Sequence, residues 1–109
     1  MNVKRKGTAG EHELAGILRD AGIDACRNDQ YLVGGRGNPD VYAEICGKPL
    51  HIEVKRVERL NINEAVHQAM RDAESGYLPV VAHRRNREPW LMTVPLLPFL
   101  DMLKAYGII

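Results

Sequence analysis

The sequence predicts a single α/β domain over residues 1–109, with a mixed central β-sheet flanked by helices. Three observations predict it. Residues 8–21 and 61–75 place apolar side chains at helical spacing. Short segments between and after them alternate apolar and polar residues, as half-buried strands do. A chain of 109 residues is long enough for one hydrophobic core but not for two.

The first predicted helix, residues 8–21, carries an acidic residue on its apolar stripe. Glu11 lies on the stripe that faces the core, whereas Glu13 is turned away and is expected to face solvent. Thr8 and Glu11 also form a capping-box pattern, which would explain Glu11 by a structural role alone. The other explanation is that Glu11 belongs to a metal site.

A short strand over residues 24–29 and a loop over residues 30–38 are expected next. The loop contains Arg36 and three glycines immediately before Asp40. Such a loop suits a close approach of a phosphate backbone to the main chain, although a simple turn has the same composition.

Residues 40–45 and 50–55 are predicted to form a β-hairpin, because both alternate and a turn-like segment separates them. A two-residue turn at residues 47–48 makes the two apolar faces coincide, with Val41 paired to Val54. A slip of one residue would move every apolar side chain to the wrong face.

The predicted register sets Asp40 opposite Lys55 and diagonal to Glu53. Two nearby carboxylates bind a hard cation such as Mg²⁺ through oxygen. A lysine beside that cation can orient a water or neutralise charge that develops on a phosphate. An amphipathic hairpin with a solvated polar face is the plain alternative. Pro39 before the aspartate, the matched register and Glu11 favour metal-assisted cleavage of a phosphodiester.

The second half of the chain predicts a helix over residues 61–75, strands over residues 77–83 and 90–94, and a closing helix from Pro95. Gln68 falls away from the apolar stripe of the second helix, so periodicity does not place it in the core. His51 shares a strand face with Glu53 and is expected to be solvated.

Charge and composition exclude little, because the net charge is +1, with 15 basic and 14 acidic residues. Basic side chains nevertheless cluster, and each cluster is either a DNA contact or a solvated turn. No stretch is long and apolar enough to span a membrane, and no secretory signal is evident. Two cysteines are too few for a zinc cluster and suggest thiols in a reducing cytoplasm. The basic candidates for DNA contact are Lys4, Arg5, Lys6, Arg56, Arg84 and Arg85.

Glu11, the Pro39-Asp40 pair and the run Glu53-Val54-Lys55 resemble the signature of the PD-(D/E)XK nuclease superfamily. The resemblance implies a restriction-endonuclease-like core. Residues 5–14 also resemble the start of archaeal-type Holliday junction resolvases. The compact core with residues 76–80 beyond the second helix is similar to small stand-alone virus-type replication-repair (VRR-NUC) nucleases.

The resemblance implies roles for individual residues. Asp40, Glu53 and the main-chain carbonyl of Val54 would bind Mg²⁺, for which Mn²⁺ could substitute. Lys55 would position or activate the attacking water, and Glu11 would hold a metal through water. Gln68 matches a glutamine that follows the motif in some branches, and it joins the candidates for DNA contact together with Arg36.

The expected function is therefore a Mg²⁺-dependent endonuclease that hydrolyses branched DNA in the cytoplasm, or in a host cytoplasm if the gene is viral. The alternatives are a catalytically inactive DNA-binding or assembly module of the same fold, and a repair or restriction-type endonuclease that cuts duplex DNA. A homodimer is expected, because a four-way junction is two-fold symmetric and one chain carries one site. The apolar residues of 90–109 suggest where the second copy binds.

Overall fold

The computed structural model describes residues 3–28 and 38–109. Within them the chain forms a five-stranded sheet in the order β1-β2-β3-β4-β5 and three helices. Strands β3 and β4 are parallel and all other neighbours are antiparallel, so the sheet is mixed as predicted. The elements are α1 (Val3–Asp20), β1 (Asp24–Arg27), β2 (Val41–Ile45), β3 (Lys48–Lys55), α2 (Ile62–Asp72), β4 (Leu78–His83), β5 (Leu91–Thr93) and α3 (Leu96–Ala105).

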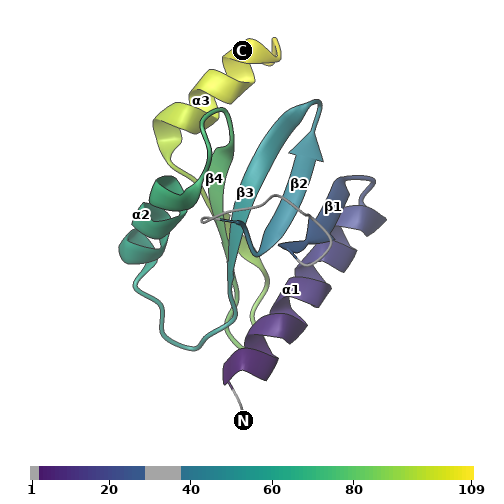
Figure 1. Cartoon of the computed structure of the whole chain (residues 1–109), viewed down its shortest axis with the longest axis vertical. Coiled ribbons are helices and arrows are strands. Elements are labelled where there is room, and N and C mark those ends of the chain that lie inside the picture. Colours follow the sequence, from purple (N-terminus) through teal and green to yellow (C-terminus); the bar gives the residue numbers. More distant parts are fainter. Residues whose placement is uncertain (1–2, 29–37) are drawn as a thin grey trace.

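Helices α1 and α2 pack on opposite faces of the sheet (Figure 1). Leu14 of α1 belongs to the main core, together with Ile52 of β3 and Val80 of β4. Ala65 and Ala69 of α2 pack with Val81 on the other face. This arrangement follows from the parallel β3-α2-β4 unit, since a parallel pair needs a crossover that covers the sheet.

The β2–β3 hairpin has a register two residues away from the predicted one. Val41 pairs with Ile52 and not with Val54, and the turn residues are Cys46 and Gly47. Both have positive φ, 52° and 84°, the conformation that tight hairpin turns require. The predicted turn was one residue too far along the chain. Because the register shift is an even number of residues, each side chain keeps its predicted face.

Helix α1 begins five residues before the predicted start, at Val3 instead of Thr8. Thr8 therefore lies inside the helix, and the capping-box explanation of Glu11 is wrong. The helix lies close to the end of β3: a Cβ on the buried Gly10 would be 3.1 Å from Cβ of Arg56 and 3.5 Å from Cγ1 of Val54.

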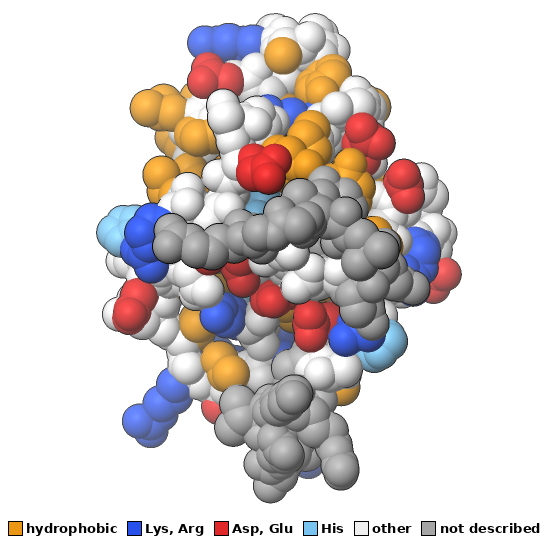
Figure 2. Space-filling view, viewed as in Figure 1, with side chains coloured by type: hydrophobic (Ala, Val, Ile, Leu, Met, Phe, Trp, Pro, Cys, Tyr) orange, Lys and Arg blue, Asp and Glu red, His pale blue; other side chains and the backbone are white. Residues whose placement is uncertain are grey.

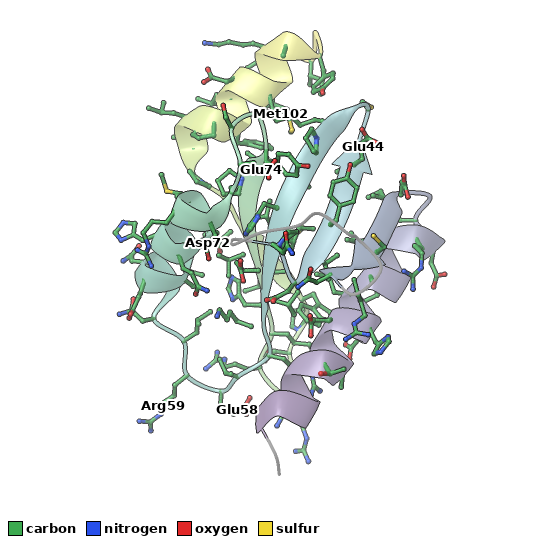
Figure 3. The ribbon with its side chains drawn as sticks, in the orientation of Figure 1. Glu44, Glu58, Arg59, Asp72, Glu74 and Met102 are labelled. Carbon is green, nitrogen blue, oxygen red and sulfur yellow. The ribbon has the colours of Figure 1, made fainter. Side chains whose placement is uncertain are left out.

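The other elements match their predictions except at their ends. Asn61 caps α2, since its side chain accepts a hydrogen bond from the N–H of Glu64. Helix α2 ends at Asp72, three residues before the predicted Ser75. Pro95 precedes α3 as the sequence predicts. Helix α3 lies beyond the end of the sheet, where Met102 reaches the core (Figures 1 and 3).

Candidate metal-dependent nuclease site

Asp40 stands immediately before β2 and reaches across to β3. Its Oδ2 accepts a hydrogen bond from the N–H of Val54 at 2.9 Å. Its side chain also shares a hydrogen bond with that of Glu53. Burial and the neighbouring charge of Glu53 raise the pKa of Asp40 from 3.8 to about 7, while the Val54 hydrogen bond opposes the rise.

Glu53 is only 4% exposed, and its carboxylate is held from two sides. Nε2 of His51 lies 2.8 Å from Oε1 of Glu53, and Asp40 hydrogen-bonds the same carboxylate. Burial alone would raise the pKa of Glu53, but the hydrogen bonds from His51 and Asp40 bring it below its usual value. The pKa values of the two carboxyl groups are therefore shifted in opposite directions, upward for Asp40 and downward for Glu53.

His51 is itself 1% exposed, so the expectation of a solvated strand histidine is wrong. The polar face of β3 is covered because α2 crosses over it on the way to the parallel strand β4.

Lys55 ends β3 on the same face as Glu53. Its Nζ donates to Oε1 of Gln68 at 3.4 Å, so α2 turns Gln68 toward the site. The sequence did not place Gln68 near the core, because the apolar stripe predicted for the second helix included Met70. The buried face is instead centred on Ala65 and Ala69, and Met70 is 49% exposed. Lys55 and Gln68 line a cavity of about 270 Å³ with Asn61 and Glu64.

Glu11 lies near the Asp40–Glu53 pair, as predicted. Its side chain is 18% exposed and its Oε2 lies 4.0 Å from Nη2 of Arg27. Its negative charge contributes to the raised pKa of Asp40.

Glu13 does not simply face solvent, which corrects the prediction. Its Oε1 accepts hydrogen bonds from Arg84 and from Nε1 of Trp90, the latter at 2.8 Å. Glu13 therefore ties α1 to the segment between β4 and β5.

The donor set fits a hard divalent cation. In the described part of the chain, no group of three or more His, Cys, Asp or Glu side chains could hold a metal ion. A cation at Asp40 and Glu53 would therefore complete its coordination with main-chain and solvent oxygens. The close pair of carboxyl groups, with Glu53 buried and Asp40 half-buried, is the feature whose negative charge a cation would neutralise.

Among the predicted basic residues whose side chains the structure describes, Arg84 and Arg85 line one cavity and Arg56 packs on α1. Arg84 donates to Glu13 and to the carbonyl of Glu88. Arg84, Arg85 and Arg59 line a second cavity of about 430 Å³, which also shares Val57 and Leu60 with the cavity of Lys55. Figure 2 shows acidic and basic side chains gathered between α1 and α2 on one face. Arg36 lies outside the described residues. The side chains of Lys4, Arg5 and Lys6 are likewise not described, although their backbone belongs to α1.

A mixed sheet flanked by helices, with Asp40 beside β2 and Glu53 and Lys55 two residues apart on β3, defines a nuclease of the PD-(D/E)XK class. Comparison with known families identifies the branch. The model of the archaeal Holliday junction resolvase (Hjc) family matches residues 2–101, and the chain belongs to this family. It is therefore a metal-dependent endonuclease of a family that acts on branched DNA.

A solved structure supports the assignment. Hjc from Archaeoglobus fulgidus, a Holliday junction resolvase of an archaeal hyperthermophile, is 30% identical and has a TM-score of 0.63. The match covers 81% of this chain and 76% of that one. No protein of curated function matches the chain. In the described residues, no helix has the length and apolarity needed to cross a membrane.

Proposed function

We propose that this chain is a Mg²⁺-dependent endonuclease that cuts Holliday junctions as a homodimer. The observation that carries the proposal is the buried contact between Asp40 and Glu53, with Lys55 on the same strand face. The two carboxylates that would hold the cation are hard oxygen ligands, which favours Mg²⁺ or Mn²⁺ over zinc.

Asp40, Glu53 and the main-chain carbonyl of Val54 would hold the cation, and Glu11 would contribute through solvent. When bound, the cation would supply Lewis-acid polarisation of the scissile phosphate. Lys55 orients the attacking water or neutralises charge on the phosphate, and Gln68 restrains its ammonium group. Each proposed role matches a side chain that lies at or beside the Asp40–Glu53 contact.

The DNA backbone would follow the two cavities that meet at Val57 and Leu60, from Lys55 toward Arg59 and Arg85. Arg59 points away from the protein in the loop after β3 (Figure 3). Phosphate contacts need exposed cations of this kind and carry no base specificity. Gln68 is the candidate in contact with Lys55, and Arg56 packs its stem on Gly10 of α1.

The second copy would bind at β5 and α3. Strand β5 is a sheet edge, and no residue of α3 is buried in the single chain. Leu91, Leu96 and Leu97 are 55%, 66% and 71% exposed. Exposed leucines beside a free edge support a partner surface.

Cys26 and Cys46 form no disulfide with each other, which suits the reducing cytoplasm that we propose as the location.

A cleavage assay tests the proposal. The protein is incubated with a four-way junction, a flap, a splayed duplex and a linear duplex, each with Mg²⁺, Mn²⁺, Ca²⁺ or EDTA. We expect paired symmetric cuts in the junction with Mg²⁺ or Mn²⁺ and none with EDTA. Preferred cleavage of the flap or the linear duplex would reject the junction as substrate, and full activity in EDTA would reject metal dependence.

A further inference from the structure

His51 is a buried polar side chain that has a defined contact with the site but no role in the chemistry described so far. It is 1% exposed, and its Nε2 lies 2.8 Å from Oε1 of Glu53. Both side chains are on the same face of β3, two residues apart, so the strand geometry itself sets the distance between them.

The surroundings restrict His51 to this contact. In the sheet, Tyr42 of β2 is its partner on one side and Pro79 of β4 on the other. Tyr42 also lies against Tyr77, with ring centroids 6.3 Å apart. A fully buried imidazole between two paired strands has few other rotamers available.

The contact limits what Glu53 can do. Because Oε1 is engaged by His51 and Asp40 hydrogen-bonds the same carboxylate, the rotation of the carboxylate is fixed with one edge turned toward Asp40. Histidine or carboxylate partners of this kind orient the residues that ligate metals, and their loss costs about 10-fold to 100-fold in metal affinity.

We infer that His51 is a positioning residue that presents Glu53 to the divalent cation. The inference rests on the proposed function, because it requires a cation at Asp40 and Glu53. It concerns metal affinity and not the chemical step, since His51 is too buried to touch DNA.

The test is the binding of Mn²⁺ alone, measured by electron paramagnetic resonance on the full chain without DNA. His51→Leu removes the donor and should weaken Mn²⁺ binding by about 10-fold to 100-fold. His51→Gln keeps an N–H donor on a long side chain and should recover part of the loss. His51→Asn is polar but too short to reach Glu53, so it should resemble His51→Leu and provides a second variant if His51→Leu does not fold.

Thr93→Val is the matched control. It removes the hydroxyl that bonds Nε2 of His83 at 2.8 Å, so it breaks a histidine hydrogen bond of equal length elsewhere on the sheet. A merely structural role for His51 predicts similar losses of thermal stability in both variants and unchanged Mn²⁺ affinity. A folded His51→Leu or His51→Asn protein with an affinity within twofold of wild type would overturn the inference. If the wild type itself bound no Mn²⁺, the proposed metal site would fail first, and this role with it.

Discussion

The N–H of Val54 donates to Oδ2 of Asp40 at 2.9 Å, and this bond joins two parts of the site that come from different strands. Val54 lies between Glu53 and Lys55, so the bond fixes Asp40 against the middle of the motif. The bond is made by the main chain of β3, and it therefore survives changes to the Glu53 or Lys55 side chains. Changes at Glu53 or Lys55 therefore alter the chemistry of the site without removing this bond.

Asp40→Asn and Glu53→Gln should each reduce junction cleavage by about 100-fold or more, because each removes charge that supports the transition state. Junction affinity should change little, since the phosphate contacts lie elsewhere. Single-turnover cleavage and gel-shift titrations in Ca²⁺ measure the two effects. Glu44→Gln is the control, because Glu44 shares the strand and face of the site but lies at the far end of β2 (Figure 3). A tenth of wild-type activity in either carboxamide variant would contradict the assignment.

Lys55→Ala should lower the single-turnover rate by about 100-fold, as loss of a positioned cation does in other electrostatic sites. Gln68→Ala should cost about tenfold or less, because it removes one hydrogen bond of 3.4 Å to Nζ of Lys55. His67→Ala, one residue away and exposed on α2, should be silent. Equal rates for the Gln68 and His67 variants would show that Gln68 does not restrain Lys55.

Glu11 and Glu13 should differ in kind. Glu11→Gln should lower the cleavage rate with little effect on thermal stability, because Glu11 lies near Asp40 and glutamine keeps the length of the side chain and one oxygen acceptor. Glu13→Ala should lower the free energy of unfolding by about 1 kcal/mol, since it removes the acceptor of Arg84 and Trp90 at a partly exposed site. Denaturant unfolding and cleavage assays separate the two. The reverse assignment, stability lost at Glu11 and activity at Glu13, is the contrary outcome.

The metal-free protein should become less stable as pH rises because of Asp40. Its pKa is about 7 in the folded protein and 3.8 as an unperturbed group, so the folded state holds the proton more tightly. The stabilisation is complete below the lower value and is lost as pH rises toward the higher one.

The melting temperature of the wild type should therefore fall relative to that of Asp40→Asn as pH rises from about 4 to about 7. Mg²⁺ should raise the wild-type melting temperature more at about pH 8 than at about pH 5, since binding competes with that proton. A difference that does not depend on pH would refute the raised pKa of Asp40.

Leu97→Glu should convert a dimer into monomers, because it places a charge on the most exposed large apolar side chain of α3. Sedimentation at micromolar concentration measures the state, and Asp101→Ala, exposed on the same helix, is the control. The monomer should still bind Mn²⁺ but should make unpaired nicks in a junction. An unchanged dimer would place the interface elsewhere.

The sequence predicted the site better than its surroundings. Asp40, Glu53 and Lys55 came together although the register was two residues out, because the faces of a strand depend only on parity. The position of the turn could not be predicted, since Cys46 is not a residue that usually adopts positive φ.

Two errors came from neighbours that periodicity cannot reveal. Glu13 has the helical phase of a solvated residue, but Arg84 and Trp90 from a distant loop cover it. His51 has the phase of a polar strand face, but the crossover through α2 buries that face. The apolar run Leu78–Ala82 did carry a signal of this, because a strand without alternation is typically covered on both sides.

The close approach at Gly10 constrains the site by geometry and not by chemistry. Glu11 follows directly, so its position relative to Asp40 depends on a neighbour that has no side chain. Even a methyl group at position 10 would lie 3.1 Å from Cβ of Arg56, so that the end of β3 or α1 would have to shift by a few tenths of an ångström. A homologue could thus retain every acid and the lysine and still have them misaligned. The identity of position 10 is therefore a separate criterion for judging whether a related chain has a working site.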